Sequence, residues 1–575
     1  MHYFRALATD YDGTIAHDGV VDDDTLAALE RLKRTGRRLV MVTGRELPDL
    51  ERVCPRLDLF DRVVAENGAL LYTPATKEQR PLGPPPPEPF VAHLRALGME
   101  PLSVGRVIVA TWEPNESAVL EAIRTLGLDL QIIFNKGAVM VLPNGINKAS
   151  GLEAALEDLG LSAHNVVATG DAENDLAFMR TCGCAVAVGN ALPAVKAAAD
   201  VVTEALRGAG VAEAIETWIA GESRLLDAAV VRHSVPIGTT PGDRREVTLR
   251  PDRGSVLITG TSGGGKSTLA TAILEQLAAS KFQLCLFDPE GDYGNFADAV
   301  TFGDANTPVT PEPVLDAVRK LGTNVTVNLL GSSVEDRPDV LASLFPAVLD
   351  IRAKYGRPHW ILVDEAHHVL PRGRDAGDGV NLDGQMPSIF VTVHPDTLAT
   401  GALQSLGTVL IIGRDSLGLI EVLSRALGRP CPPLPDRGPE VGEAVYWECR
   451  TDAPPALIAV NKPKGAVKRH TRKYADGTLG EDRSFFFRGP DGAMRIRAQN
   501  LSMFLQVGDG VDRDTYLFHL RNGDFETWIR TSIKDDDLAD EVANFAANDD
   551  LSIDEDRRLM RAAIEGRYTA PATPD

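Results

Sequence analysis

The sequence has few cysteines, and only two of them lie close together. Its 575 residues include six cysteines, and the one near pair is Cys182 and Cys184, a spacing too tight for an ordinary zinc knuckle. That class of metal site is therefore excluded. We expect the cysteines to be reduced and structural, as the cytosol would keep them.

The sequence also lacks a long apolar run. No uninterrupted stretch approaches the roughly 18 residues that a membrane-spanning helix needs. The N-terminus reaches Asp10 and Asp12 before the apolar core of a secretory signal could form. We therefore expect a soluble, cytoplasmic protein with no membrane partner.

Basic residues are fewer than acidic ones. The chain has 59 Lys and Arg against 81 Asp and Glu, a formal net charge of −22. Long-range repulsion of phosphates disfavours a protein whose whole surface binds nucleic acid or an anionic membrane, but a local basic site stays open. Hydrophobic residues make up 44% of the chain, which argues against wholesale disorder. A chain this long cannot be served by one core, so about two to four domains are expected.

Short β-branched apolar runs alternate with amphipathic helical patterns over residues 1–220. This alternation is typical of a parallel sheet covered by helices. A proline-dense stretch, 81–89, interrupts it and opens a segment that we interpret as a small inserted α+β cap at about 82–145. A second α/β pattern follows at 228–460. The remaining residues, 465–575, form a small mixed accessory domain whose role the sequence leaves open.

Two carboxylates follow the first apolar strand pattern, in Asp10-Tyr11-Asp12-Gly13-Thr14. Residues two apart on a strand point the same way, so Asp10 and Asp12 would present paired carboxylates where α/β sheets place their ligands. One could be a nucleophile and the other an acid/base. Three further polar segments follow or border strand ends: Thr43-Gly44-Arg45, Lys148 and Gly170-Asp171-Ala172-Glu173-Asn174-Asp175. Four segments can therefore converge on one phosphate.

This set resembles the haloacid dehalogenase phosphatases. The stretch Glu66-Asn67-Gly68-Ala69 and the place of the insert resemble the subclass with a type IIB (Cof-type) cap. The resemblance covers about residues 3–219, with all four family motifs in order. It implies a Rossmann-like core and an aspartyl-phosphate, formed when Asp10 attacks phosphorus. Asp12 would protonate the leaving oxygen and later activate water.

The same resemblance implies the remaining roles. Thr43 would hydrogen-bond the phosphoryl oxygens, and Lys148 would neutralise the charge spread over them. Mg²⁺, a hard ion, would be held by acidic residues, namely Asp10, Asp12, Asp171 and Asp175. A small cap covers little substrate, which favours a compact ester such as phosphoglycolate, a sugar phosphate or a glycerate-type phosphate.

A glycine-rich turn follows the strand pattern at 255–260 and opens a helix pattern. It matches GxxxxGK[ST], in which backbone N–H groups cradle phosphates, Lys266 reaches the β/γ oxygens and the Ser267 hydroxyl binds Mg²⁺. The residues expected to bind ATP here are Gly260, Gly263, Gly264, Gly265, Lys266, Ser267 and Thr268. A later strand pattern ends in Asp364, which would bind the metal through water, and Glu365, which would polarise the attacking water.

The stretch Asp288-Pro289-Glu290-Gly291-Asp292-Tyr293 resembles an element of the HerA/FtsK-type ATPases, the DUF87 group. This resemblance covers about residues 230–450 and implies a RecA-like ATPase domain. It also implies a ring of subunits if Arg414 or Arg425 reaches a neighbour's ATP, with surface or packing arginines as the alternative. His394 lies where the family commonly carries a polar sensor such as Gln, a departure that argues against efficient hydrolysis of ATP.

Two features allow a nucleic-acid interpretation. Residues 364–367 spell the box of DEAH helicases, but no second P-loop-like core or arginine-rich motif follows, so we interpret the match as coincidence. The basic run at 462–473 precedes an aromatic strand pattern at 485–487, a combination that can bind single strands. The acidic helical patterns further on favour a solvated linker beside a core strand instead.

The sequence thus predicts a Mg²⁺-dependent phosphomonoesterase joined to a P-loop domain that binds and hydrolyses ATP, with two separate sites. One alternative is a P-loop domain that senses ATP and regulates the phosphatase. The other is a DNA-translocating or end-processing protein whose phosphatase acts on nucleic-acid or nucleotide phosphates.

Overall fold

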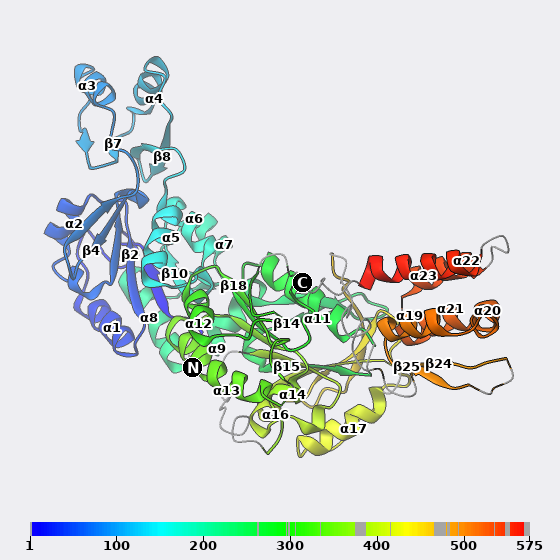
Figure 1. The fold of residues 1–575 in the computed structure, drawn as a ribbon. Coiled ribbons are helices and arrows are strands. Elements are labelled where there is room, and N and C mark those ends of the chain that lie inside the picture. Colours follow the sequence, from blue (N-terminus) through cyan, green and yellow to red (C-terminus); the bar gives the residue numbers. More distant parts are fainter. Residues whose placement is uncertain are drawn as a thin grey trace.

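The computed structural model describes residues 3–568 except 262–263, 295, 297–298, 305, 334, 374–386, 414–415, 465–478, 480–482, 491, 493, 534 and 547–551. Two α/β regions follow one another along the chain, and a helical region with one hairpin ends it (Figure 1). The expected α/β fold class is confirmed. The domain boundaries given above stay a prediction.

The N-terminal region is built on an eight-stranded sheet in the order β12-β11-β10-β1-β2-β3-β4-β5. Strand β1 (Ala6–Thr9) pairs in parallel with both β10 (Val166–Gly170) and β2 (Arg38–Val42). All four residues of β1 are buried, as expected for a parallel strand covered by helices on both faces. Because these strands are parallel, the residues that follow them meet at one edge of the sheet.

The other elements of this region frame that edge. Its remaining strands are β3 (Arg62–Ala65), β4 (Leu70–Thr73), β5 (Glu78–Pro81), β11 (Cys184–Ala187) and β12 (Val201–Val202). Its helices are α1 (Asp23–Arg34), α2 (Leu47–Val53), α5 (Lys148–Leu159), α6 (Leu176–Thr181), α7 (Pro193–Ala198), α8 (Arg207–Ala220), α9 (Ser223–Ala228) and α10 (Val230–His233). Short 3₁₀ turns are η1 (Leu57–Leu59), η2 (Glu66–Gly68), η3 (Ala163–Asn165) and η4 (Glu173–Asp175).

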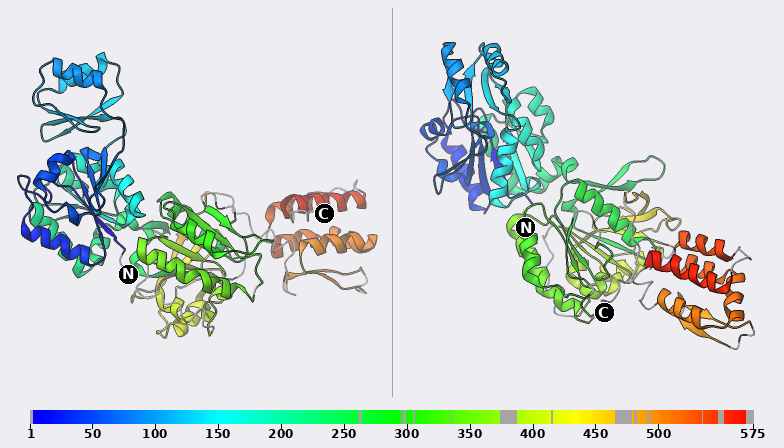
Figure 2. Two further views of the ribbon diagram at one scale, coloured as in Figure 1. Left: turned by 60° about the vertical axis from the view of Figure 1, so that its left-hand side comes forward. Right: turned by 45° about the horizontal axis from the view of Figure 1, so that its top comes forward.

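The proline-dense stretch leads into the cap, a four-stranded antiparallel sheet in the order β6-β7-β9-β8. Two helices cover the face of this sheet that points away from the rest of the N-terminal region, so its other face lies toward that region (Figure 2). The elements are α3 (Glu88–Ala96), β6 (Ser103–Val104), β7 (Val109–Trp112), α4 (Glu116–Thr125), β8 (Leu130–Asn135) and β9 (Ala138–Pro143).

The central region has an eleven-stranded sheet in the order β14-β13-β23-β22-β21-β15-β20-β19-β16-β18-β17. The strands from β21 to β17 in this order are parallel, and the first four add an antiparallel edge. The parallel strands are β15 (Ser255–Gly260), β16 (Leu284–Asp288), β17 (Ala299–Phe302), β18 (Asn324–Asn328), β19 (Trp360–Val363), β20 (Ser388–Thr392) and β21 (Leu406–Ile412). The antiparallel ones are β13 (Val235–Thr239), β14 (Glu246–Leu249), β22 (Glu443–Glu448) and β23 (Ala456–Val460).

Apolar cores cover both faces of this sheet, which explains why central strands such as β16 and β19 are largely apolar. The helices are α11 (Lys266–Ala279), α12 (Pro311–Arg319), α13 (Arg337–Tyr355), α14 (Ala366–Val369), α16 (Thr400–Ser405) and α17 (Ser416–Ala426), with short turns η5 (Pro251–Arg253) and η6 (Pro395–Thr397).

The C-terminal region packs helices against a hairpin of β24 (Phe485–Phe487) and β25 (Ile496–Ala498). Phe485 and Phe487 are buried, and both rings contact Phe504. The interpretation of 485–487 as a core strand is therefore confirmed, and these two rings are not available to stack on bases. The helices are α19 (Leu501–Gly510), α20 (Arg513–Arg521), α21 (Asp524–Trp528), η8 (Ile529–Ile533), α22 (Asp536–Ala546) and α23 (Ile553–Tyr568).

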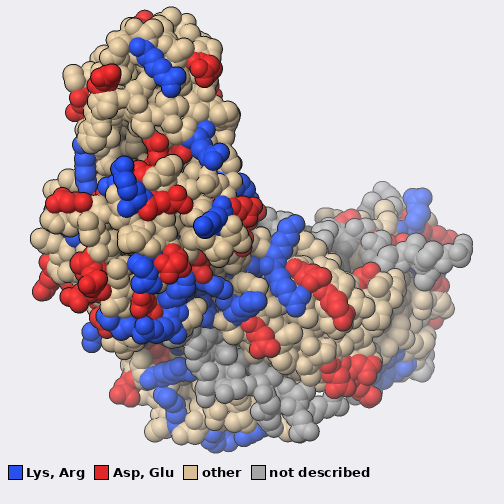
Figure 3. Space-filling model, turned by 90° about the vertical axis from the view of Figure 1, so that its left-hand side faces the viewer, with Lys and Arg blue, Asp and Glu red and all other residues tan. Residues whose placement is uncertain are grey.

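Three observations bear on the expectations from composition. All six cysteines are unpaired thiols, and five of them are buried. No helix in the described part of the chain has the length and apolar composition needed to cross a membrane. On the face shown in Figure 3, acidic and basic side chains are interspersed over the cap and the N-terminal region. Most of the basic run at 462–473 lies outside the described residues.

Candidate functional site

Three buried carboxylates meet at the carboxyl ends of β1 and β10. Asp10, Asp171 and Asp175 each offer an oxygen atom, and these atoms lie within 4.8 Å of one another. Asp175 is held at the end of η4 because its Oδ2 accepts hydrogen bonds from the backbone N–H groups of Asp171 and Ala172, both at 2.9 Å. Three converging oxygen donors of this type suit Mg²⁺.

Lys148 lies between two of these carboxylates. Its Nζ donates to Asp10 Oδ1 at 2.5 Å and to Asp175 Oδ1 at 2.6 Å, and its side chain is 1% exposed. Lys148 is the first residue of α5, which Asn147 caps by accepting from the backbone N–H of Ala149. Burial alone would lower the pKa of Lys148, but the two carboxylates outweigh it and raise the pKa. The lysine is therefore charged at neutral pH.

Binding of Mg²⁺ is expected to weaken as the pH falls below about 7. Burial raises the pKa of Asp10 to about 7, and the charge of Asp175 adds to the rise while Lys148 opposes it. Below that pH the metal-free site holds a proton on Asp10, which Mg²⁺ has to displace. Apparent affinity should fall roughly tenfold per pH unit below the pKa and level off above it. Calorimetric titration with Mg²⁺ over this range measures the slope, and an affinity independent of pH would contradict the assignment.

Two threonines lie at the same edge of the sheet, and one of them contacts the aspartates. Thr14 donates from Oγ1 to Asp10 Oδ2 at 3.1 Å and stands 3.3 Å from Asp171 Oδ1. Thr43 follows β2 and is fully buried; its Oγ1 accepts from the backbone N–H of Arg45 at 3.2 Å. The sequence assigned a role to Thr43 but none to Thr14, whose contact with both aspartates depends on the fold.

Asp12 does not join the three buried carboxylates. Its side chain is 43% exposed and accepts two hydrogen bonds of 2.7 Å from Arg45. The expectation that Asp10 and Asp12 point the same way relied on strand alternation. That rule does not govern them because β1 ends at Thr9 and the chain turns, with three successive N–H groups bonded to the carbonyl of Tyr11. The pair is therefore divided between Lys148 and Arg45.

The Glu66-Asn67-Gly68 stretch anchors the cap. Glu66 is 1% exposed, and its carboxylate accepts from the backbone N–H groups of Arg106 at 2.9 Å, Val107 at 2.8 Å and Ile108 at 3.1 Å. A Cβ on Gly68 would lie 1.9 Å from the carbonyl oxygen of Asn147, so only glycine fits there. This motif therefore connects the cap segment 106–108 to the start of α5.

The described residues predicted to bind ATP lie at the carboxyl end of β15 and at the start of α11. Lys266 begins α11 and is 7% exposed; its Nζ donates to the carbonyls of Gly260 at 3.3 Å and Thr261 at 3.1 Å. Gly265, at φ 100°, lies in the left-handed region that favours glycine. The Gly264 N–H donates to the Thr261 carbonyl at 3.0 Å. Ser267 and Thr268 continue α11, and Gly263 lies outside the described residues.

Acidic residues follow the neighbouring parallel strands. Asp364, directly after β19, is buried, and burial raises its pKa, with the charge of Asp292 adding to the rise. Asp288 ends β16; burial raises its pKa to about 7, although it accepts from the backbone N–H groups of Asp292 and Tyr293. Ser267 Oγ lies 3.4 Å from Asp292 Oδ2. The P-loop and the acidic residues after β16 and β19 therefore lie at the same edge of the central sheet.

Glu365 has a histidine neighbour. Its Oε2 lies 3.4 Å from His367 Nδ1, which is 3.0 Å from Thr392 Oγ1. The ring of His394 lies 5.2 Å from that of His367, so the region expected to carry a polar sensor lies beside the histidine that contacts Glu365. Arg425 is exposed on α17, and Arg414 lies outside the described residues.

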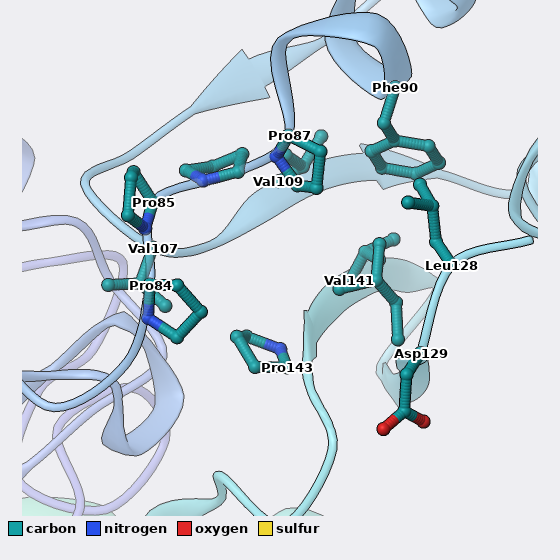
Figure 4. Close-up of a pocket in the computed structure, with 12 residues that line it drawn as sticks. Pro84, Pro85, Pro87, Phe90, Val107, Val109, Leu128, Asp129, Val141 and Pro143 are labelled. Atoms are coloured by element: carbon teal, nitrogen blue, oxygen red, sulfur yellow. The ribbon is translucent and has the colours of Figure 1, made fainter. Parts of the chain in front are cut away.

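The cap contains an apolar cavity of about 180 Å³ that is separate from these sites. It is lined by the prolines of the hinge and by side chains of the cap sheet and α3, with Asp129 as its charged residue (Figure 4). None of the catalytic, nucleotide-binding or metal-ligating residues expected from the sequence lines it.

Comparison with known proteins agrees with both resemblances. Residues 7–82 and 117–215 match the model of the haloacid dehalogenase-like hydrolases, and residues 235–345 match that of the central domain of helicase HerA. A phosphoglycolate phosphatase from Methanothermobacter thermautotrophicus is 34% identical over 223 residues, which are 37% of this chain and 99% of the relative.

Two further similarities concern the same region. A 5-amino-6-(5-phospho-D-ribitylamino)uracil phosphatase from Bacillus subtilis is 29% identical over 248 residues, covering 37% of this chain and 96% of the relative. A crystal structure of a haloacid dehalogenase-like hydrolase from Bacteroides thetaiotaomicron is 23% identical, covers 37% of this chain and 99% of that chain, and gives a TM-score of 0.33.

Proposed function

Since the chain belongs to the haloacid dehalogenase-like hydrolases, we propose that its N-terminal region is a Mg²⁺-dependent phosphomonoesterase that acts on a small phosphate ester. The observation that carries this proposal is the buried group of Asp10, Asp171 and Asp175 with Lys148 between two of its members. Mg²⁺ held by these aspartates would neutralise charge on the phosphoryl group.

The chain's own residues supply the steps of the reaction. A carboxylate oxygen of Asp10 attacks phosphorus, the ester P–O bond breaks, and Asp12 gives its proton to the leaving oxygen. Asp12 then takes a proton from water, whose oxygen attacks the aspartyl-phosphate and releases inorganic phosphate with Asp10 restored. Lys148 and Thr43 hold the phosphoryl oxygens, while Arg45 positions Asp12.

A compact ester of the phosphoglycolate or sugar-phosphate type is the substrate we propose. One relative is named for phosphoglycolate and another for a ribityl-amino-uracil phosphate, so the relatives' names differ in substrate. Phosphate release should be measured over phosphoglycolate, sugar phosphates, nucleotides and end-phosphorylated oligonucleotides, with Mg²⁺ present. Turnover of short esters supports the proposal. Turnover of oligonucleotides alone, or of nothing, would contradict it.

For the central region we propose Mg²⁺-dependent binding and hydrolysis of ATP. Lys266 and the N-terminus of α11 would bind the phosphates, Ser267 and Asp364 would hold the metal, and Glu365 would polarise water. Support comes from the common edge of β15 and β19 and from the match to the HerA central domain. Assembly into a ring remains part of this proposal and is tested by light scattering with and without ATP.

Regulation of the phosphatase by ATP is the second candidate function, and a contact between the two regions favours it. We call this contact the seam. The His164 ring stacks on Phe282 with centroids 4.2 Å apart, and its Nε2 donates to the Ser280 carbonyl at 2.9 Å. Ser280 directly follows α11, the helix that begins with Lys266. The P-loop helix thus ends on the phosphatase region.

A second bond in the seam joins the starts of two strands that lead to metal-site carboxylates. Asn165 precedes β10, whose end carries Asp171; His359 precedes β19, whose end carries Asp364. Asn165 Oδ1 accepts from His359 Nε2 at 3.2 Å, and both residues are buried. His359 Nδ1 accepts from the Gln283 N–H at 2.8 Å, so the ring is neutral, and burial keeps its pKa well below the usual range.

If ATP regulates the phosphatase, saturating ATP is expected to change the phosphatase rate about fivefold. His164→Ala, which removes the stack on Phe282, should reduce the effect of ATP and leave the rate without ATP within about twofold. Phosphate-ester turnover with a non-hydrolysable ATP analogue measures this. An unchanged rate in the wild type would remove regulation as a function of this chain.

A further inference from the structure

The hairpin of β8 and β9 carries a lysine toward the phosphatase site. Asn135 pairs with Ala138, so Lys136 and Gly137 form a two-residue turn. Their φ angles are 48° and 87°, and turns with positive φ at both places favour Asn and Gly. A lysine is an unfavourable choice at the first place, and such departures gather at functional sites.

The lysine reaches over the proposed nucleophile loop. Lys136 Nζ lies 2.7 Å from Asp171 Oδ2 and 3.4 Å from the backbone oxygen of Asp12. A Cβ on Gly13 would lie 2.9 Å from the same Nζ. The Lys136 side chain is 47% exposed, whereas that of Asp171 is 4% exposed. The ammonium group thus stands on the open side of the metal-ligand group, next to the proposed acid/base.

Elsewhere the hairpin also lies close to the catalytic edge. A Cβ on Gly44 would be 3.6 Å from the sulfur of Met140, a residue of β9, and β8 packs against η4. Glu66 fixes the other side of the cap through its three backbone hydrogen bonds. The cap therefore packs over the site. Lys136 Nζ takes its position with the cap closed on the rest of the N-terminal region.

The other two cations near the site are each bonded to two carboxylates. Lys148 bonds two aspartates, and Arg45 bonds Asp12 and Asp49. Both partners of Lys148 are, like Asp171, residues proposed to hold Mg²⁺, but Lys148 is 1% exposed and lies between two of them. Lys136 differs because its side chain is 47% exposed and, among the described residues, it bonds one carboxylate, that of Asp171. Metal binding would use that carboxylate and leave the ammonium for an anion on the leaving-group side.

We propose that Lys136 determines substrate specificity by binding a carboxylate at the non-transferred end of the ester. The enzyme then prefers short phosphate esters of hydroxy acids to neutral esters of similar size. This inference rests on the proposed phosphatase function. Lys136 Nζ lies 3.4 Å from the backbone oxygen of Asp12, and so close to the proposed acid/base. A carboxylate bound by Lys136 therefore has to lie near the phosphoryl group of the same ester, so this contact suits short leaving groups and excludes long ones.

The test compares Lys136→Asn and Lys136→Arg in the full chain. Asn suits a left-handed turn position but carries no charge, and Arg retains the charge. With Lys136→Asn, kcat/KM for phosphoglycolate should fall roughly 10- to 100-fold, mainly through KM, since a charge-assisted hydrogen bond is lost. At saturating Mg²⁺ the value for glycerol phosphate should fall much less than that for phosphoglycolate, and Lys136→Arg should recover most of the loss for phosphoglycolate. Equal losses for both esters would overturn the inference.

A second measurement needs no turnover. In calorimetric titration with Mg²⁺ alone, Lys136→Asn should bind the ion several-fold more tightly than the wild type, because the ammonium no longer competes for Asp171. Unchanged or weaker affinity would overturn the inference. If the wild type hydrolyses no ester, the proposed function fails and the inference fails with it. If the wild type hydrolyses esters and Lys136→Asn keeps the same preference for phosphoglycolate over glycerol phosphate, the inference fails while the proposed function stands.

Discussion

Replacing Asp10 by Asn is expected to reduce phosphate-ester turnover by roughly 10⁴-fold or more, as losses of a covalent nucleophile do. The amide has nearly the same shape as the carboxylate but cannot attack phosphorus. Lys148 keeps its bond to Asp175 in this variant, so the fold should survive. Steady-state phosphate release measures the loss, and a thermal melt reports the fold.

The matched control for this variant is Asp24→Asn, at an exposed aspartate on α1. It removes one carboxylate of the same region and should leave turnover within about twofold. ATP hydrolysis should also be unaffected in Asp10→Asn, since the P-loop follows β15, a strand of a different sheet from β1. Retained ester turnover in a folded Asp10→Asn protein would mean that another group attacks phosphorus.

Replacing Lys266 by Ala is expected to weaken ATP binding on the order of 100-fold, because charge-assisted contacts to the phosphates are lost. Hydrolysis of ATP should fall at least as far. Lys266 lies against the carbonyls of Gly260 and Thr261, at the start of α11, and takes no part in the N-terminal site. Titration with a fluorescent ATP analogue and an ATPase assay measure the two effects.

Lys320→Ala, at an exposed lysine of the central region, is the control for the second variant and should bind ATP like the wild type. Phosphate-ester turnover without ATP should be unchanged in Lys266→Ala. If either Asp10→Asn or Lys266→Ala abolished both activities in a folded protein, the two sites would not be independent, and the seam would have to carry more than regulation.

Much of the N-terminal site could be predicted because its parts follow strands. Asp10, Thr43 and Asp171 come directly after β1, β2 and β10, and parallel pairing brings those ends together. Lys148 starts a helix whose N-cap, Asn147, is visible in the sequence. Local patterns therefore contained enough information to gather these side chains, although their roles came from the family resemblance.

The rest depends on contacts between residues far apart in the chain. Glu66 bonds backbone groups of the cap about 40 residues later, and Lys136 reaches Asp171 across the cap hairpin. Neither contact leaves a periodic pattern, and the positive φ of Lys136 appears only once β8 and β9 are paired. The pairing of Asp12 with Arg45 was missed for a different reason, namely that β1 ends one residue before Asp10.

The seam is the clearest case of information that no motif carries. His164 lies in the short turn η3, and Phe282 lies in the segment before β16. The two rings become partners only when the two α/β regions pack together. Similarly, the aromatic run at 485–487 was compatible with a nucleic-acid surface until burial of Phe485 and Phe487 placed it in a core. In both cases tertiary packing, and not local sequence, decides the role.

The most direct test of the central claim, that Asp10 is the nucleophile of a phosphatase, is to trap the aspartyl-phosphate. The full chain is mixed with phosphoglycolate carrying a radiolabelled phosphoryl group, or with the best ester of the screen, and quenched in acid within a turnover. We predict label on the wild-type protein that hydroxylamine releases and that is absent from Asp10→Asn. Label retained by Asp10→Asn, or none on a wild type that turns over the ester, would contradict the account.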